Sequence, residues 1–155
     1  TNARMTSKEL LGILAKDYPP PDMAFIPELR GGTGYSCEQR VDALAMHCWP
    51  SRGLEMIGFE LKVSRNDWFR ERKQPWKAEF AKKFCDKWYL VVSDLKIVEY
   101  ADELPKGWGL MFAEYGAIHV MIEAEKLTPE PINRPFLASL MRRATNQELT
   151  KTLTK

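Results

Sequence analysis

Two carboxylates and a lysine near the middle of the chain have a spacing that suits metal-assisted cleavage of a phosphodiester bond. Glu60 and Lys62 are two residues apart in a strand-like run, so their side chains point to the same face of a sheet. Asp42 lies in a second strand-like run eighteen residues upstream. Phosphodiester cleavage needs a cation that binds a phosphate oxygen, and Mg²⁺ or Mn²⁺ is held by carboxylate oxygens. These three side chains are therefore our candidate catalytic group.

A turn between the two runs decides which residues face each other. Residues 49–53 contain a proline and a glycine, which is typical of a turn. If the chain folds back around Ser51, residues whose numbers add up to 102 lie opposite one another, and Asp42 faces Glu60. The backbone carbonyl of Leu61 is then within reach of the same ion. We predict a metal site made of Asp42, Glu60 and the Leu61 carbonyl, with Lys62 beside it.

The sequence leaves two alternatives open for this group. Lys62 either holds or deprotonates the attacking water, or stabilises the charge of the transition state. The same three residues would also occur in an exposed ion-pair ladder, which contributes only about 0–1 kcal/mol to stability. The opposite face of the strand favours a central strand beside a cleft instead, because it is apolar throughout: Ile57, Phe59, Leu61 and Val63.

Residues after the second strand are candidates for contact with a substrate phosphate. Ser64 and Asp67 form a capping box, and the helix N-terminus that they begin can bind phosphate, although capping alone explains both residues. Arg65 is expected to point toward the same substrate. Lys77 falls within the apolar stripe of the next helical segment, so its side chain either extends to solvent or contacts phosphate. Arg40 completes the predicted substrate-binding set.

The remaining patterns predict a single α/β domain over residues 5–144, with residues 1–4 as the remnant of an expression tag and residues 145–155 as a polar tail that frays. We expect helices over 6–18 and over 64–85, the second interrupted before Pro75, and a final helix from Pro135. Strands are expected over 23–29 at an edge, 39–46, 57–63, 88–92, 97–100, 109–112 and 117–122. The expected buried face of the final helix is Phe136, Leu137, Leu140, Met141 and Ala144.

Composition limits the classes of protein that fit the chain. The 155 residues carry a net charge of +2, so contact with nucleic acid needs a local basic patch, for which residues 62–83 are the candidate. The three cysteines have no CxxC spacing, which favours reduced thiols in a cytoplasmic protein over disulfides or a zinc ribbon. No apolar run approaches the roughly 18 residues of a membrane span, and no signal-peptide pattern is seen.

Asp42 followed by Glu60-Leu61-Lys62 resembles the PD-(D/E)XK signature of restriction-endonuclease-like nucleases. A longer pattern is similar to a phage and bacterial branch known as MmcB-like DNA-repair proteins, and this similarity covers residues 24–144. It is carried by Arg40–Met46, Trp49–Leu54, Glu60–Trp68, Pro75–Glu79, Cys85–Trp88, Leu104–Leu110 and Arg134–Leu137.

The resemblance implies a mixed central β-sheet flanked by helices, in the order αβββαβ, with extra C-terminal strands and a final helix. It also implies that Asp42 and Glu60 bind the metal and that Lys62 is catalytic. The chain departs from the family where it reads Val41-Asp42 instead of Pro-Asp. It departs again at residues 30–34, which lack the acid that relatives often carry, so that Glu28 or Glu38 would have to replace it.

These observations predict a Mg²⁺- or Mn²⁺-dependent deoxyribonuclease that acts in DNA repair or in the processing of phage or mobile-element DNA. The alternatives are a non-catalytic nucleic-acid-binding module that keeps the fold, and an RNA nuclease. DNA is the predicted partner and a membrane is not. A homodimer is an assembly that the sequence neither requires nor excludes.

Overall fold

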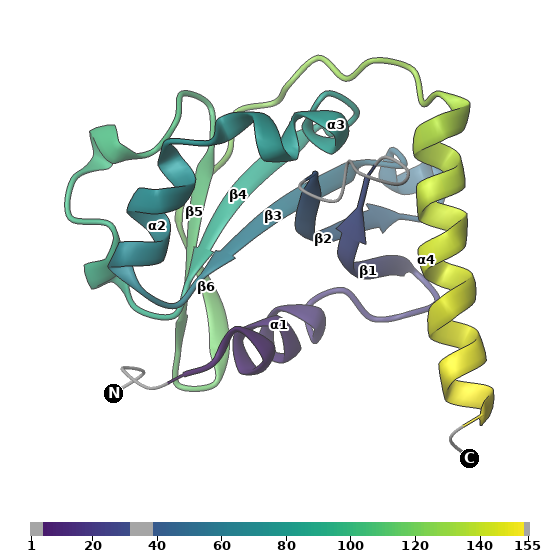
Figure 1. Ribbon diagram of the computed structural model, residues 1–155, viewed down its shortest axis with the longest axis horizontal. Coiled ribbons are helices and arrows are strands. Elements are labelled where there is room, and N and C mark those ends of the chain that lie inside the picture. Colours follow the sequence, from purple (N-terminus) through teal and green to yellow (C-terminus); the bar gives the residue numbers. More distant parts are fainter. Residues whose placement is uncertain (1–4, 32–38, 154–155) are drawn as a thin grey trace.

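The computed structural model describes residues 5–31 and 39–153 (Figure 1). The helices are α1 (Ser7–Ala15), α2 (Arg65–Arg72), α3 (Glu79–Lys82) and α4 (Arg134–Leu153). The strands are β1 (Met23–Arg30), β2 (Arg40–His47), β3 (Met56–Lys62), β4 (Lys87–Val92), β5 (Gly109–Glu114) and β6 (Ala117–Ile122). Short 3-10 turns are η1 (Pro50–Arg52), η2 (Pro75–Ala78), η3 (Leu95–Ile97) and η4 (Ala101–Glu103).

The six strands form one mixed sheet in the order β1-β2-β3-β4-β5-β6. Pairs β1–β2, β2–β3 and β5–β6 are antiparallel, while β3, β4 and β5 run parallel. Parallel neighbours need a crossover connection, and the segment with α2, η2 and α3 supplies it between β3 and β4. The prediction of an α/β fold with a mixed sheet, flanking helices and a C-terminal helix is confirmed.

The hairpin register predicted from the turn at Ser51 is confirmed. In the β2–β3 ladder Ala43 pairs with Phe59, Leu44 with Gly58 and Met46 with Met56, so each pair of residue numbers adds up to 102. The η1 turn ends at Gly53, whose φ of 80° lies in the left-handed region that glycine adopts most readily. The ladder ends at the pair of Ala43 and Phe59, so Asp42 and Glu60, the next pair in this register, lie just beyond its end.

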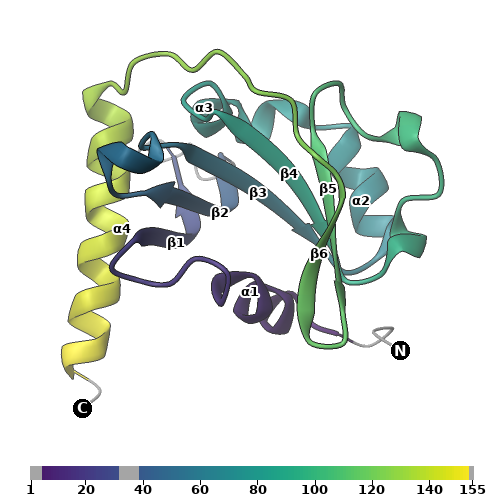
Figure 2. The ribbon, with the colours of Figure 1, turned by 180° about the vertical axis from the view of Figure 1, so that it is seen from behind.

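Helices cover the two faces of the sheet with different side chains (Figures 1 and 2). On one face, Leu10 and Leu14 of α1 pack on a buried layer that includes Phe59 and Leu61 of β3. On the other face, the α2–α3 segment covers the residues of opposite parity, among them Trp88. Helix α4 stands at the β1 edge, where Arg143 donates a hydrogen bond to the Pro27 carbonyl at 2.7 Å. Glu60 and Lys62 face the α2–α3 segment through Glu71, whereas Asp42 lines hollows that Ser7 of α1 also lines.

Two expectations about secondary structure are wrong. The segment 97–100 is not a strand, because the chain forms the η3 turn, capped by Asp94, and then enters η4. Helix α4 continues to Leu153, past the residue where we expected fraying to begin. Its buried face is also narrower than predicted, since Phe136 is buried while Leu137 and Met141 are exposed. The helix lies along a sheet edge, which covers less of its surface than a sheet face would.

No helix within the described residues is long and apolar enough to cross a membrane. Cys48 and Cys85 are free thiols, and Cys37 lies outside the described residues.

Candidate functional site

The site lies where β2 and β3 separate. The last pair of their ladder is Ala43 with Phe59, and beyond it Asp42 Oδ2 accepts a hydrogen bond from the Leu61 N–H at 2.8 Å. The Asp42 carboxylate thus takes the place of a backbone acceptor at the end of the ladder. In an antiparallel pair the N–H and C=O of one residue point to the same neighbouring strand. The Leu61 carbonyl is therefore directed toward the Asp42 side, as the predicted metal site requires.

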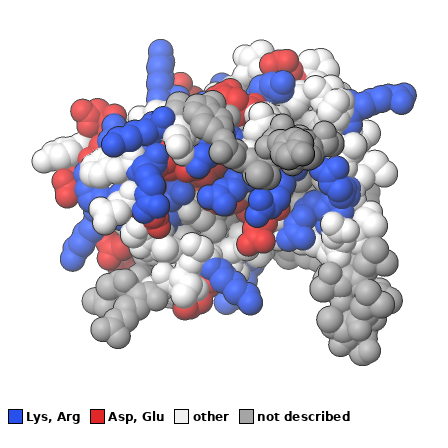
Figure 3. All heavy atoms as spheres, viewed as in Figure 1, with Lys and Arg blue, Asp and Glu red and all other residues white. Residues whose placement is uncertain are grey.

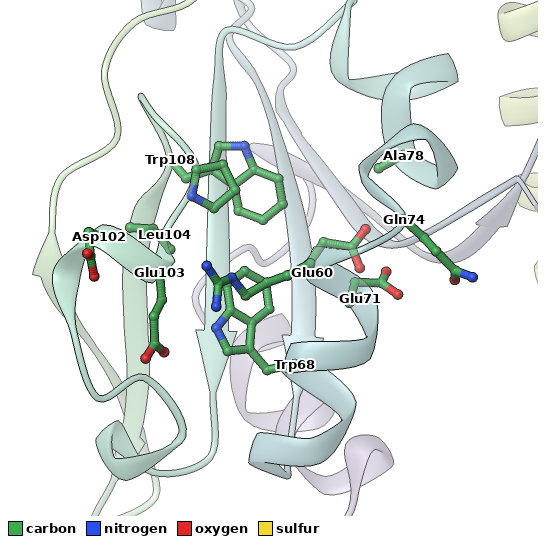
Figure 4. Close-up of a pocket in the computed structure, with 11 residues that line it drawn as sticks. Glu60, Trp68, Glu71, Gln74, Ala78, Asp102, Glu103, Leu104 and Trp108 are labelled. Atoms are coloured by element: carbon green, nitrogen blue, oxygen red, sulfur yellow. The ribbon is translucent and has the colours of Figure 1, made fainter.

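Glu60 is the most unusual carboxylate in the described part of the chain. Only 3% of its surface is exposed, and its Oε1 has no hydrogen-bond partner among the described residues. Burial raises the pKa of Glu60 well above its usual range, and the nearby charges of Asp42 and Glu71 raise it further, whereas Lys62 acts in the opposite direction. A hydrogen bond with Glu71 also favours the protonated form. In Figure 4 the carboxyl groups of Glu60 and Glu71 lie beside each other.

Lys62 is held by a partner that the sequence analysis missed. Its Nζ lies 3.7 Å from Oε2 of Glu71 on α2, and both side chains are largely buried, with 13% and 15% of their surface exposed. Glu71 follows the buried Trp68 by three residues, so helical spacing places it on the side of α2 that faces the sheet. That spacing is the signal that could have found Glu71. The site therefore contains three acidic groups around one lysine.

A polar cleft with a volume of about 360 Å³ lies beside these residues. It is lined by five charged residues of the predicted site, namely Asp42, Lys62, Arg40, Lys77 and Asp67, together with Leu61, whereas Glu60 does not line it. Its other lining residues are Ser7, Val63, Arg70, Glu71 and Gln74. Figure 3 shows Lys and Arg side chains gathered across the face of the molecule that Figure 1 presents. The cleft is thus a polar hollow lined by four cationic and three acidic side chains.

Arg65 and Ser64 do not line this cleft, and the expected direction of Arg65 is corrected. The Arg65 guanidinium donates to both oxygens of Glu103, at 3.0 and 2.7 Å, and to the Ile97 carbonyl at 2.7 Å. It also lies over the ring of Phe69, 4.0 Å from the centroid. Ser64 accepts from the Asp67 N–H at 3.2 Å and caps α2. Both residues build the helix rather than the cleft.

The structure places one of the two candidate replacement acids near the site. Glu28 lines a hollow adjoining the cleft, together with Asp42, Leu61 and Arg143. Its backbone has a φ of 53°, a left-handed conformation that is uncommon for a residue other than glycine. Glu38 lies outside the described residues.

The donors fit a hard divalent cation that keeps several of its waters. Among the described residues no group of three His, Cys, Asp or Glu side chains converges closely enough to hold an ion alone. Mg²⁺ does not need such a cage, because it is often bound by one or two carboxylates and completes its shell with water. Asp42, the unpartnered oxygen of Glu60 and the Leu61 carbonyl supply hard oxygen donors of this kind.

Comparisons with known proteins identify the fold but no family. No family model matches the chain, and no curated protein matches it either. A protein of unknown function from Silicibacter pomeroyi has a similar solved structure, with a TM-score of 0.60 and 19% sequence identity. The alignment covers 97% of this chain and 88% of that chain. At this level of identity the likeness shows a shared fold and nothing about function.

Proposed function

We propose that this protein is a divalent-metal-dependent nuclease that hydrolyses phosphodiester bonds of DNA. The observation that carries the proposal is the buried Glu60, which has an unpartnered carboxylate oxygen within the described residues and lies close enough to Asp42 for that charge to raise its pKa. A buried carboxylate without a partner destabilises a fold, so stability does not explain its presence. A bound cation would supply the missing partner.

Asp42, Glu60 and the Leu61 carbonyl would hold Mg²⁺ or Mn²⁺, which when bound polarises a phosphate oxygen and activates water. The hydrogen bond from the Leu61 N–H fixes the orientation of the Asp42 carboxylate. It also leaves Asp42 with oxygen lone pairs directed into the polar cleft, which Asp42 lines. Glu60 does not line this cleft, so its side chain would have to turn toward the cleft to share an ion with Asp42.

Lys62 would stabilise the negative charge that develops on the reacting phosphate. Its ammonium lies in the cleft, and the carboxylate of Glu71 at 3.7 Å keeps it close to α2. Positive charge fixed before the reaction stabilises a transition state without reorganisation during the step. We infer that Glu71 is a positioning residue, which acts through Lys62 and through its contact with Glu60.

The cations of the cleft would bind the DNA backbone on either side of the reacting phosphate. Arg40, Arg70 and Lys77 line the same hollow as Asp42 and Lys62. Lysine and arginine contacts to phosphate supply affinity without reading sequence, and they make binding weaker at high salt. An RNA nuclease would use the same residues. A non-catalytic binding module would have no need of a buried, unpartnered glutamate.

Cleavage of supercoiled plasmid and of single-stranded DNA with Mg²⁺ or Mn²⁺ tests the proposal. We expect nicking by the wild type, none by Glu60→Ala, and wild-type nicking by Glu130→Ala, which changes an exposed glutamate in the segment before α4. Preparing the wild type and the two variants side by side controls for a contaminating nuclease. Equal activity of the wild type and Glu60→Ala would contradict the proposal.

A further inference from the structure

A second hollow lies on the other side of Glu71 and Gln74 from the polar cleft. We call it the tryptophan cavity, because Trp68 and Trp108 form much of its wall (Figure 4). Its volume of about 300 Å³ is at the lower end of the range for small-molecule sites. Glu60 lines this cavity, and Leu104 adds to its apolar surface. It thus borders the proposed catalytic carboxylate directly.

The polar atoms without partners are concentrated at this cavity. Four buried side-chain nitrogen or oxygen atoms lack a hydrogen-bond partner within the described residues, and three of them belong to cavity-lining residues: Trp68 Nε1, Trp108 Nε1 and Glu60 Oε1. The fourth is the Nε1 of Trp88, whose ring centroid lies 6.0 Å from that of Trp108. Native folds leave few such groups unsatisfied, so a cluster of them calls for a ligand that satisfies them.

The indole rings of Trp68, Trp88 and Trp108 are held in place by close packing against their neighbours. Gly58 of β3 pairs with Trp88, and any side chain at Gly58 would collide with the Trp88 ring. The Trp108 ring in turn packs against both Trp88 and Trp68, at centroid distances of 6.0 and 6.3 Å. The cavity wall is therefore a fixed aromatic surface rather than a loose gap between side chains.

The chemistry of the wall favours an uncharged, flat heterocycle. Indole N–H groups only donate, whereas a carboxyl group accepts, or donates when protonated. A nucleobase offers both acceptors and donors at its edge and two faces for stacking on aromatic rings. Arg72 is the one cation among the residues that line the cavity, and the acids outnumber it. Four cations line the polar cleft, namely Arg40, Lys62, Arg70 and Lys77, so a phosphate is attracted to the cleft more than to the cavity.

We propose that the tryptophan cavity receives one unstacked nucleobase of the DNA strand whose phosphate lies in the polar cleft. Glu71 and Gln74 line both hollows, so the two hollows are neighbours and could receive two parts of one nucleotide. This proposal rests on the proposed nuclease function. It adds that the enzyme needs a base next to the reacting phosphate that is free to leave its stack, as in single strands, ends or damaged duplexes.

Binding of fluorescent single-stranded oligonucleotides, with Ca²⁺ in place of Mg²⁺ to prevent cleavage, tests this proposal. In a series of such oligonucleotides, a single abasic site is moved one position at a time, and affinity is measured by fluorescence anisotropy. To fix the register, the strand ends in a short duplex. We expect one position at which loss of the base weakens binding by about five- to hundred-fold, the range of base stacking on an aromatic side chain.

Two variants of the cavity should remove this position dependence. Ala78→Leu fills the cavity from η2, and Trp108→Leu removes an aromatic face and an N–H donor. Lys77→Ala is the matched control in the polar cleft, and it should weaken binding of every oligonucleotide by a similar factor while the sensitive position remains. Circular dichroism identifies a variant that has failed to fold, in which case the other cavity variant decides.

The outcomes separate the two proposals. Binding that is equally strong for every abasic position in the wild type would overturn the base-binding cavity and leave the nuclease proposal standing. A sensitive position that persists in both folded cavity variants would also overturn it. Failure to bind any oligonucleotide, with no cleavage in Mg²⁺, would overturn both proposals.

Discussion

Two buried glutamates line the tryptophan cavity, and their surroundings are opposite. Glu103 is 7% exposed, and the Arg65 guanidinium donates to both of its oxygens. That hydrogen-bonded pair lowers the pKa of Glu103. Glu60 is 3% exposed, has an oxygen without a partner among the described residues, and has a pKa that burial raises well above its usual range. Both carboxyl oxygens of Glu103 therefore have hydrogen-bond partners, whereas one carboxyl oxygen of Glu60, in the same cavity, has none within the described residues.

The difference separates a structural carboxylate from a functional one. A buried charge that is paired and hydrogen-bonded is compatible with a stable fold, whereas an unpaired one destabilises it. Helix α2 supplies the partner at both ends, Arg65 to Glu103 and Glu71 to Glu60, but the second partner is itself acidic. A fold that needed only stability would place a cation or an apolar residue at position 60.

The largest expected effect contrasts the two glutamates in catalysis. Glu60→Gln keeps the shape of the side chain and removes its charge, so metal-dependent DNA cleavage should fall by roughly 10²-fold or more. Glu103→Gln should retain metal-dependent cleavage at temperatures where it is folded. Initial rates of plasmid nicking at saturating Mg²⁺ measure both. A comparable loss in the two variants would erase the distinction that we draw between them.

Stability should respond in the opposite order. Glu103→Leu leaves the Arg65 guanidinium with one partner fewer in a partly buried setting, and the midpoint of thermal unfolding should fall by several degrees. Replacing both residues, as Arg65→Met with Glu103→Leu, should recover part of that loss, because the only charge then left without its Arg65 partner is that of the exposed Glu99. Glu60→Gln should instead raise the midpoint at neutral pH without metal. Differential scanning calorimetry of the wild type, the Glu103→Leu variant, the double variant and the Glu60→Gln variant measures these four midpoints of thermal unfolding.

The pH dependence of stability should also differ in sign between the two sites. The folded-state pKa of Glu60 is above the ordinary value of about 4.5, so between these two pKa values the native protein binds more protons than the unfolded chain does. The contribution of Glu60 to the free energy of unfolding is therefore complete at low pH and is lost as pH rises toward the raised pKa. The lowered pKa of Glu103 has the opposite effect. Its contribution to the free energy of unfolding is present above the ordinary pKa of a glutamate and is lost as the solution becomes more acidic.

Urea unfolding at about pH 5 and about pH 8 in EDTA measures this effect. Relative to the wild type, Glu60→Gln should gain more stability at the higher pH, and added Mg²⁺ should stabilise the wild type more than the variant. A gain of equal size at both pH values would show that Glu60 is ionised in the fold to the same extent as in the unfolded chain.

The parts of the site that depend on neighbours in one hairpin were predictable from the sequence. The turn signal and strand alternation predicted the register of β2 and β3, because side-chain period and turn position fix a hairpin, and Asp42 and Glu60 lie just beyond the end of that ladder. Lys77 was found by its position on the helix and lies in the cleft. The parts that depend on distant segments were missed. Arg65 meets Glu103 from 38 positions away, and no local pattern indicates such a pairing.

The same reason explains the two errors in secondary structure. Residues 97–100 have the apolar character of a strand, but Asp94 accepts from the Lys96 N–H and directs the chain into a 3-10 turn. The sequence of helix α4 is amphipathic. How much of its apolar face is buried nevertheless depends on whether the helix lies on a face or at an edge of the sheet. Glu60 itself was identified by spacing, while its tryptophan surroundings come from three separate segments.

The smallest expected effect concerns the cap of the helix that joins the two glutamates. Ser64 Oγ accepts from the Asp67 N–H at 3.2 Å at the start of α2, and Thr6 Oγ1 accepts from the Glu9 N–H at 3.1 Å at the start of α1. Each alanine substitution should therefore lower the free energy of unfolding by about 1 kcal/mol. Because Ser64 does not line the polar cleft, Ser64→Ala should bind DNA as well as Thr6→Ala does. Weaker DNA binding by Ser64→Ala alone would mean that the N-terminus of α2 contacts phosphate. The end of the helix that pairs with Glu103 would then share in function, and the division between the two glutamates would be less sharp than their hydrogen bonds indicate.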